Sequence, residues 1–290
     1  MPKISVIIPC YKAQPFIRRC LDSLLCQTET DWEAVCIDDE SPDETGAILE
    51  EYSEQDPRFK VYHQLNAGVS ASRNFAVEKA EGEYVIFIDA DDFIHPQTME
   101  ICLLTARRFK ADMVAYTYNR EYRTQHIIRH LLHMGDREEI SYEQYDPENV
   151  STFTTDNIYD WVTEYSKPKD IDPKWAVKHC QAWRCMYAAK LVKSVRFIFG
   201  IAYEDFPWWG EVLLKVNRTA IINLPLYYYY PNKTSYIFTA SQEHRVESLR
   251  KAIAASENTY ENAPEYKKHK WEQNFLVPFR AKLERKSKKL

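Results

Sequence analysis

The first part of the chain alternates short apolar runs with longer segments in which apolar residues recur every three or four positions. The short runs predict β-strands, and the longer segments predict amphipathic α-helices. The runs show little alternation of apolar and polar residues, as expected of strands that are covered on both faces. The predicted strands are 4–9, 34–38, 59–63, 84–89 and 112–116.

The segments between these strands predict helices at 15–28, 43–55 and 68–80, and Pro96 opens a further helix. Asp43 is placed to cap the second of them. Strands that alternate with helices predict βαβ units and a mainly parallel sheet, so we expect an α/β fold. The first helix shows its apolar face most clearly, with Phe16, Cys20, Leu21, Leu24 and Leu25 on one side.

The pattern becomes irregular after the fifth strand and recovers later. Residues 117–178 are rich in Tyr, His, Arg, Asp and Glu, and we interpret them as a variable region over an active site. Beyond it the spacing predicts helices at 181–193 and 205–217 and a strand at 220–230. Pro225 places that strand at a sheet edge or at a bulge.

Composition narrows the class of protein. The chain has 290 residues, of which 45% are hydrophobic, enough to bury a substantial core. The net charge of -5 argues against a nucleic-acid binder. Seven scattered cysteines favour free thiols in a reducing cytosol. We find no signal peptide and no apolar stretch long enough to span a membrane, so we expect a cytoplasmic protein.

The tail, residues 261–290, is basic and contains several aromatic residues. Such a segment can lie on an anionic membrane surface, which predicts peripheral contact with the inner face of the cell membrane. An ordinary solvated helix has the same composition. Both interpretations remain open from the sequence.

Acidic residues follow two of the predicted strands. Asp38 and Asp39 end the second, and Asp89, Asp91 and Asp92 follow the fourth. Ligands of parallel sheets bind at the carboxyl ends of the strands. Carboxylates gathered there repel one another, and a divalent cation relieves the repulsion while it bridges to a diphosphate. The sequence therefore predicts a site for Mn²⁺ or Mg²⁺ and a nucleoside diphosphate.

Several motifs, in this order, resemble family 2 glycosyltransferases of the GT-A fold, and the resemblance covers about residues 3–238. It implies a Rossmann-like mixed sheet with helices on both faces. It also implies a nucleotide-binding half at 1–116, an acceptor-side half at 117–238 and a helical basic extension at 239–290. The matching segments are 5–11, 37–45, 66–74, 82–92, 203–205 and 227–235.

The resemblance implies roles for residues of the first half. Pro9 and Tyr11 would line the nucleotide pocket. Asp39 would accept a hydrogen bond from the base, with uracil and therefore a UDP-sugar expected, and Asp38 would lie beside it. Arg73 would lie near the base or the diphosphate.

Three further aspartates are implied to take part in the reaction. Asp89 would face the donor sugar or ribose, Asp91 would bind the metal, and Asp205 resembles the general base of the family. A single displacement needs only one base, because the acceptor hydroxyl attacks as the diphosphate leaves. The expected reaction is therefore inverting.

The acceptor side is predicted from fewer signals. Glu204, Trp208 and Trp209 flank Asp205 in the sequence, and aromatic rings can pack against the C–H faces of sugars, so we expect acceptor contacts there. The sequence departs from the family pattern at Glu40, where glycine is usual, and at Lys12, where asparagine is frequent. Glycine would permit a positive φ at low cost.

Several functions stay open from the sequence. The first is transfer of a sugar to a glycan or lipid-linked glycan in cell-surface polysaccharide or lipopolysaccharide synthesis. The second is a polyprenyl-phosphate glycosyl synthase, whose phosphate acceptor needs no base. The third is a catalytically silent nucleotide-binding scaffold. No GxxxxGK[ST] or GxGxxG motif follows the first strand, which argues against nucleotidyltransferases and dinucleotide enzymes.

Overall fold

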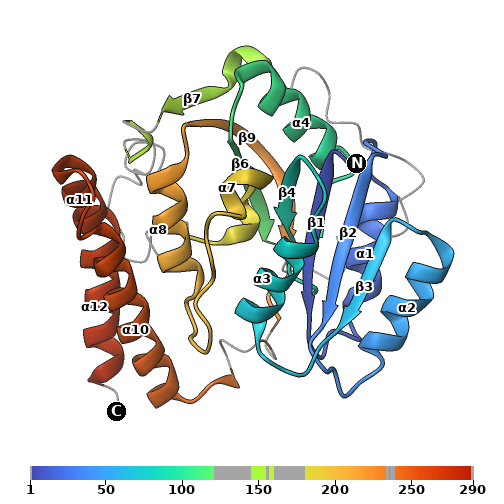
Figure 1. The fold of residues 1–290 in the computed structure, drawn as a ribbon, viewed down its shortest axis with the longest axis horizontal. Helices are drawn as coiled ribbons and strands as arrows, with labels where there is room; N and C mark the ends of the chain where they lie inside the picture. Colours follow the sequence, from blue (N-terminus) through green and yellow to red (C-terminus); the bar gives the residue numbers. More distant parts are fainter. Residues whose placement is uncertain are drawn as a thin grey trace.

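The computed structural model describes residues 2–120, 145–154, 157–159, 180–232, 235 and 239–288 (Figure 1). Most of the predicted variable region, 117–178, lies outside these residues. The described strands form one mixed sheet in the order β3-β2-β1-β4-β8-β6-β9-β5, and β7 pairs with β9. Helices cover both faces of this sheet (Figure 1).

The first half of the sheet is parallel, as predicted. The prediction for 59–63 matches β3 residue for residue, and the other strands agree to within a few positions. Helices α1, α2 and α3 confirm the three helical segments. The elements are β1 (Ile4–Cys10), α1 (Ile17–Leu25), β2 (Trp32–Asp38), α2 (Thr45–Gln55), β3 (Phe59–His63), α3 (Val69–Lys79) and β4 (Tyr84–Phe87).

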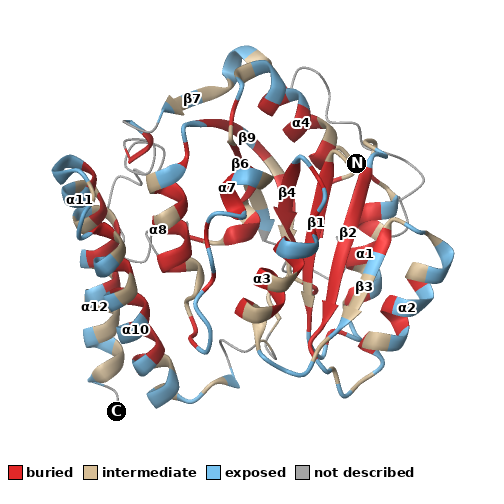
Figure 2. Cartoon of the chain, in the orientation of Figure 1, coloured by how far each residue is buried: buried red, intermediate tan, exposed pale blue. Residues whose placement is uncertain are grey.

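Strand register brings the predicted acidic segments to one edge of the sheet. In β1, Cys10 lies opposite Asp38 of β2, and Ile7 lies opposite Phe87 of β4. The residues that follow β2 and β4 therefore leave the sheet at the same edge, on either side of β1. Strands β1, β2 and β4 are almost entirely buried, which fixes this edge to the core (Figure 2).

The second half contains one wrong prediction. Residues 181–193 are not a continuous helix, because a buried strand, β8, occupies their centre and pairs antiparallel with both β4 and β6. The elements are β5 (Phe93–Ile94), α4 (Thr98–Phe109), β6 (Met113–Arg120), η1 (Pro147–Asn149), β7 (Ser151–Thr154), η3 (Ala182–Arg184), β8 (Cys185–Ala188), α7 (Ala189–Val192), α8 (Asp205–Lys215) and β9 (Arg218–Tyr229).

The predicted bulge in the last strand is confirmed. Strand β9 pairs in parallel with β6, and the register shifts where Thr117 lies opposite Pro225. Proline has no N–H to donate to a neighbouring strand, so an irregular pairing at this position leaves no donor unsatisfied.

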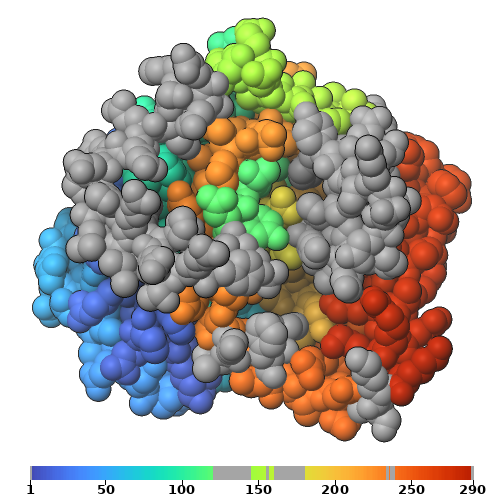
Figure 3. All heavy atoms as spheres, turned by 180° about the vertical axis from the view of Figure 1, so that it is seen from behind, coloured from blue at the N-terminus to red at the C-terminus, as the bar shows by residue number. Residues whose placement is uncertain are grey.

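Three helical segments follow the sheet and pack against α8 on one flank of the molecule (Figures 1 and 3). They are α10 (Gln242–Tyr260), α11 (Glu265–Trp271) and α12 (Val277–Ser287), and a π-helical turn at Glu272–Leu276 joins the last two. None of the helices in the described ranges is long and apolar enough to cross a membrane.

The aromatic residues of the tail point into the protein. Trp271, Phe275 and Phe279 are each at most 2% exposed. The Phe279 ring stacks on Phe206 of α8 with 3.7 Å between centroids, and Trp271 stacks on Tyr260 at 4.7 Å. The apolar face that suggested a membrane surface therefore binds α8. Membrane contact through the tail stays a prediction that rests on its charges alone.

Gly210 of α8 permits this close packing. A Cβ atom there would lie 2.8 Å from Cζ2 of Trp271 and 3.2 Å from Cε2 of Tyr260. The extra methyl group overpacks the contact, which destabilises the fold by about 1–3 kcal/mol. Alanine favours the helix over glycine by about 1 kcal/mol, which offsets part of that loss. We therefore expect Gly210→Ala to lower the free energy of unfolding by about 1 kcal/mol. Urea denaturation measures this change.

A double-mutant cycle with Trp271→Phe is the control, because the smaller ring removes the atoms nearest to Gly210. Gly210→Ala should then cost less in the Trp271→Phe background than in the wild type. Equal costs in both backgrounds would show that these helices do not pack as described.

Candidate active site at the carboxyl ends of the strands

The turn after β2 is fixed by Asp39, which is 3% exposed. Its Oδ1 accepts hydrogen bonds from Gln64 Nε2 at 2.6 Å and from the Ala67 N–H at 2.9 Å. Its Oδ2 accepts from the Gly68 N–H at 2.8 Å. Asp39 therefore holds the segment that leads into α3. Recognition of a nucleotide base by Asp39 stays a prediction, and a base would share these oxygens with the loop.

Asp38 stabilises the same turn from the other side. One carboxylate oxygen accepts from the Ser41 N–H at 3.1 Å, and the other lies 3.0 Å from His63 Nδ1. The second ring nitrogen of His63 lies 2.7 Å from Glu50. Hydrogen bonds to Glu50 and then to Asp38 raise the pKa of His63, which favours a cationic bridge between the two carboxylates.

Tyr11 and Pro9 lie at the end of β1, beside this turn. Pro9 is half-buried, and the Tyr11 ring is 48% exposed with the Lys12 ammonium 5.1 Å from its centroid. Lys12 and Glu40 both adopt left-handed backbone conformations, with φ of 52° and 58°. The loop thus keeps a glycine-like conformation at Glu40, at a cost of about 1–2 kcal/mol. An exposed tyrosine ring at this position suits stacking against a nucleobase.

The acidic segment after β4 is anchored by Asp92, which is fully buried. Its Oδ2 accepts from the Tyr227 hydroxyl at 2.6 Å, and its Oδ1 accepts from the Tyr230 N–H at 2.7 Å. The Tyr227 hydroxyl also accepts from the Asp89 N–H at 3.2 Å. Asp92 therefore fixes the segment to β9 and is occupied by these contacts.

Asp91 is half-buried and differs from Asp92 in its contacts. Its Oδ2 accepts a hydrogen bond from Asn232 Nδ2 at 3.0 Å. Its Oδ1 accepts no hydrogen bond from another residue in the described ranges. Burial, with the nearby Asp89 charge, raises the pKa of Asp91 to about 6. A carboxylate in this environment favours a cation as a neighbour.

A hard divalent cation could bind at Asp91 if substrate phosphates and water completed its coordination shell. The described residues contain no group of three or more His, Cys, Asp or Glu side chains that would hold a metal by themselves. Mg²⁺ commonly binds through one or two carboxylates together with substrate phosphates and water. The Asp91 carboxylate can supply the protein's share of such a shell, and the phosphates would supply the rest.

A buried arginine joins the two acidic segments that the sequence keeps far apart. Arg73 of α3 is 3% exposed. Its Nη2 donates to Asp89 Oδ1 at 2.9 Å, and its Nη1 donates to Glu204 Oε1 at 2.7 Å and to Asp205 Oδ1 at 3.1 Å. We name these four residues the Arg73 cluster. Arg73 was expected near the base or the diphosphate, and in the structure it pairs with three carboxylates.

Asp205 is the first residue of α8, and its side chain is 20% exposed. Burial raises the pKa of Asp205 to about 8; Arg73 opposes this rise, and Glu204 and Asp89 add to it. The preceding Tyr203 has a φ of 65°, which turns the chain sharply before the helix. Asp205 is therefore a partly accessible carboxyl group whose pKa suits proton transfer near neutral pH.

The predicted acceptor platform at Trp208 and Trp209 is wrong. Both side chains are 1% exposed, so neither ring offers a face to a sugar. The Trp208 ring stacks on Phe197 with 4.5 Å between centroids and meets Phe87 edge-on at 5.5 Å. These tryptophans belong to the core that supports α8. Glu204, the third predicted acceptor residue, lies in the Arg73 cluster with 13% of its side chain exposed.

Two supporting residues were not singled out from the sequence. Tyr227 holds Asp92 and the backbone of Asp89, and Asn232 bonds Asp91. Both lie within the 227–235 segment that matches the family motif. A tyrosine-rich run does not reveal which hydroxyl reaches the acidic segment.

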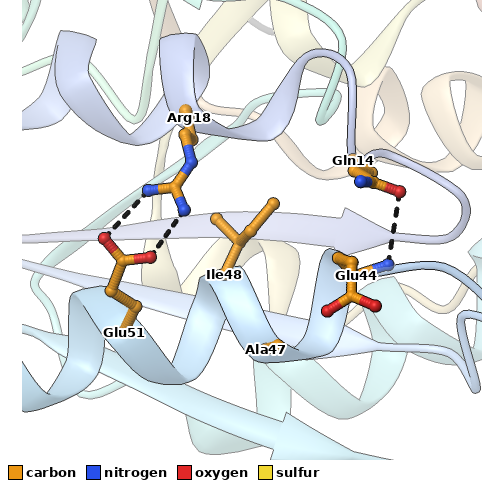
Figure 4. Close-up of a pocket in the computed structure, with 6 residues that line it drawn as sticks. All are labelled: Gln14, Arg18, Glu44, Ala47, Ile48 and Glu51. Carbon is orange, nitrogen blue, oxygen red and sulfur yellow. Dashed lines mark hydrogen bonds and ion pairs between the residues drawn. The ribbon is translucent and has the colours of Figure 1, made fainter.

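A surface hollow lies between α1 and α2, away from these residues (Figure 4). Arg18 and Glu51 in its wall form an ion pair with two hydrogen bonds, at 3.0 and 2.5 Å. The hollow contains none of the predicted site residues. Its lining residues are Gln14, Arg18, Glu44, Ala47, Ile48 and Glu51.

The chain is similar in sequence and in fold to known glycosyltransferases. Glycosyltransferase GlyA of Streptococcus pneumoniae is 33% identical over 80% of this chain, but the chain spans only 31% of the length of GlyA. The structure of S. aureus TarS in complex with UDP-GlcNAc has a TM-score of 0.67 and 22% identity, over 96% of this chain and 71% of that one.

A second solved structure, the mannosyltransferase PcManGT from Pyrobaculum calidifontis in complex with GDP-Man and Mn²⁺, has a TM-score of 0.57 and 16% identity. It covers 97% of this chain and 73% of PcManGT. These two likenesses confirm the predicted GT-A fold. The family model for glycosyl transferase family 2 matches residues 5–159, which is more than half of the chain. The chain therefore belongs to glycosyl transferase family 2.

Proposed function

We propose that the chain is an inverting, metal-dependent glycosyltransferase that moves a sugar from a nucleotide-sugar to an acceptor hydroxyl. The expected donor is a UDP-sugar, and the expected acceptor is a glycan or lipid-linked glycan of a cell-surface polysaccharide or lipopolysaccharide. The observation that carries the proposal is the Arg73 cluster, in which a buried arginine holds Asp89 beside Asp205. This pairing supports a role for Asp89 in donor binding and a role for Asp205 as the base.

The donor would lie along the carboxyl edge of β1, β2 and β4. The exposed Tyr11 ring would stack on the base, and the Asp39 turn would recognise the edge of the base. TarS, which is bound to UDP-GlcNAc in its structure, supports uracil as the base. Asp89, fixed by Arg73 through one oxygen, would contact the ribose or the donor sugar.

Asp91 would hold the metal together with the diphosphate. The cation, when bound, neutralises the charge that develops on the leaving diphosphate. PcManGT, bound to GDP-Man and Mn²⁺ in its structure, supports a divalent metal at such a site. Asn232 would orient Asp91 through the bond to its Oδ2.

Asp205 would act as the general base. The acceptor oxygen forms a bond to the anomeric carbon while the bond from that carbon to the diphosphate oxygen breaks on the opposite face. The acceptor proton moves to the Asp205 carboxylate, and the nucleoside diphosphate leaves. An α-linked donor then gives a β-linked product without a covalent intermediate.

The stereochemistry of the first-formed product tests this proposal. Each α-linked UDP-, GDP- or TDP-sugar is incubated with the protein and Mn²⁺, with water in place of the acceptor hydroxyl, and proton NMR follows the anomeric signal of the released sugar before it equilibrates. We expect the β anomer to appear first as UDP is released from one UDP-sugar. An α anomer formed first would rule out single displacement at Asp205.

The raised pKa of Asp205 predicts a pH dependence. Only the ionised carboxylate accepts a proton, so kcat/KM should rise about tenfold per pH unit below pH 8 and level off above it. Glu204→Gln removes one of the charges that raise this pKa, so its profile should shift to lower pH. A profile that is flat between pH 6 and pH 9 in both proteins would exclude Asp205 as the base.

A further inference from the structure

Helix α1 contacts the acidic segment that carries the proposed metal ligand. Arg19 of α1 is half-buried, and its Nη2 donates a hydrogen bond to the backbone carbonyl oxygen of Asp91 at 2.6 Å. The Sγ atom of the next residue, Cys20, lies 4.0 Å from the carbonyl oxygen of Asp89. Two neighbouring side chains of α1 therefore contact the backbone of this segment, at Asp89 and at Asp91.

Two aromatic rings hold the Arg19 guanidinium in place. Its central carbon lies 4.8 Å from the centroid of the Phe93 ring and 4.6 Å from the centroid of the Tyr230 ring. Both residues are tied to Asp92, since Phe93 follows it in the chain and the Tyr230 N–H donates to its Oδ1 at 2.7 Å. Cation–π contacts of this kind restrict the orientations of a guanidinium. The bond to Asp91 is therefore made from a fixed position.

Helix α1 is itself fixed to the chain that follows the acidic segment. Gln27, just after α1, is 4% exposed. Its Nε2 donates to the His95 carbonyl oxygen at 2.8 Å, and its Oε1 accepts from the Met99 N–H at 3.2 Å. The Oγ atom of Ser23 accepts from the Ile94 N–H at 3.4 Å. These bonds keep α1 and the acidic segment in one relative position.

Packing alone does not explain an arginine at position 19. Its Nε is buried and has no hydrogen-bond partner among the residues that the structure describes. Arg19 also forms no ion pair within these residues, whereas its neighbour Arg18 pairs with Glu51. A buried N–H without a partner destabilises a fold, so an apolar side chain would fill the same space with less destabilisation. The bond to the Asp91 carbonyl is the contact that requires an arginine.

We propose that Arg19 is a positioning residue for the metal site, which fixes the Asp91 peptide so that the Asp91 carboxylate is directed at the cation. Asn232 orients the carboxylate itself through the bond to its Oδ2. The inference rests on the proposed function, in which Asp91 holds the metal together with the diphosphate. Groups that hold a metal ligand in its orientation contribute about ten- to a hundredfold to metal affinity. Arg19 thus sets the concentration of Mn²⁺ that nucleotide binding needs.

Calorimetric titrations of the full chain with UDP, at increasing Mn²⁺ concentrations and in EDTA, test this role. Arg19→Met removes the donor and the charge, and the methionine side chain packs well against aromatic rings. We expect Arg19→Met to need at least about tenfold more Mn²⁺ than the wild type to reach the same affinity for UDP. The affinity in EDTA and the number of UDP molecules bound per chain should not change. A general loss of folding would instead lower that number.

Arg18→Met is the matched control, the same substitution at the preceding residue, whose side chain is 50% exposed. It should need the same Mn²⁺ concentration as the wild type. An unchanged Mn²⁺ requirement in Arg19→Met overturns the inference. A loss of UDP affinity that is as large in EDTA as in Mn²⁺ also overturns it.

A double-mutant cycle with Asp91→Ala shows whether Arg19 acts through Asp91. In the Asp91→Ala background, Arg19→Met should not weaken UDP binding in Mn²⁺ any further. Additive losses would mean that Arg19 contacts the diphosphate, or supports the pocket, independently of Asp91. That outcome excludes the positioning role.

Arg19→Lys covers the case in which Arg19→Met does not fold. Lysine keeps the charge and a donor but lacks the planar guanidinium that contacts the two rings. We expect Arg19→Lys to need more Mn²⁺ than the wild type, with an unchanged affinity for UDP in EDTA. If Arg19→Met does not fold and Arg19→Lys needs no more Mn²⁺ than the wild type, the arginine serves the fold and the inference is overturned.

The wild-type titration separates this inference from the proposed function. A wild type that binds no UDP, or binds it equally well without Mn²⁺, contradicts the proposed function and this inference with it. A wild type that needs Mn²⁺ to bind UDP, but needs no less of it than Arg19→Met does, overturns the inference alone.

Discussion

Asp205→Asn should reduce kcat by about a hundred- to ten-thousandfold, the range that general bases contribute. The asparagine side chain keeps an oxygen for Arg73, so the Arg73 cluster keeps its geometry while the base is lost. The KM for the nucleotide-sugar should change little, because Asp205 acts on the acceptor. Steady-state kinetics with the donor identified by NMR measures both constants.

Glu204→Gln is the matched control, because it changes the neighbouring acid, which also bonds Arg73. We expect it to lower kcat far less than Asp205→Asn at high pH. If Asp205→Asn keeps full turnover, the acceptor needs no base. That outcome would favour the polyprenyl-phosphate synthase, whose acceptor is already ionised.

Arg73→Met should lower the free energy of unfolding by about 3–5 kcal/mol, the usual cost of leaving buried charges without their partner. The guanidinium bonds three carboxylates, and its side chain is 4% exposed. Without it, Asp89, Glu204 and Asp205 repel one another. The loss should be smaller at low pH, because protonation removes that repulsion.

Urea denaturation of Arg18→Met provides the comparison. Arg18 also pairs with an acid, Glu51, but both side chains are about half exposed, at 50% and 45%. That change should cost less than about 1 kcal/mol. If Arg73→Met and Arg18→Met lower the free energy of unfolding equally, the Arg73 cluster does not stabilise the fold as a buried ion-pair network.

Much of the fold follows from local pattern, whereas pairings between distant segments do not. The apolar runs predicted β1, β2 and β4 because those strands are covered on both faces, as their burial shows. The run Cys185–Ala188 is short and apolar, and it is a strand because β4 and β6 offer it partners. Its neighbours in the sequence suggested a helix. Tertiary pairing overrides local preference in such runs.

The candidate site shows the same limit. Sequence motifs located Asp89 and Asp205, but the arginine that joins them is 132 residues from Asp205. The rings of Trp208 and Trp209 face the core, which a motif does not reveal. In the tail, Trp271, Phe275 and Phe279 recur every fourth residue, the spacing of one helical face. That spacing was the available signal that the tail packs against another helix.

Calorimetric titration with UDP, GDP and TDP, in Mn²⁺ and then in EDTA, tests the central claim most directly. We expect one nucleotide, UDP, to bind in Mn²⁺ and to weaken at least about tenfold in EDTA and in Asp91→Ala, because charged contacts contribute about 1.5–3 kcal/mol. Asp31→Ala, at a half-exposed aspartate before β2, should bind as the wild type does. Folded protein that binds none of the nucleotides, or binds UDP equally well in EDTA and in Asp91→Ala, would contradict a metal-dependent nucleotide-sugar site.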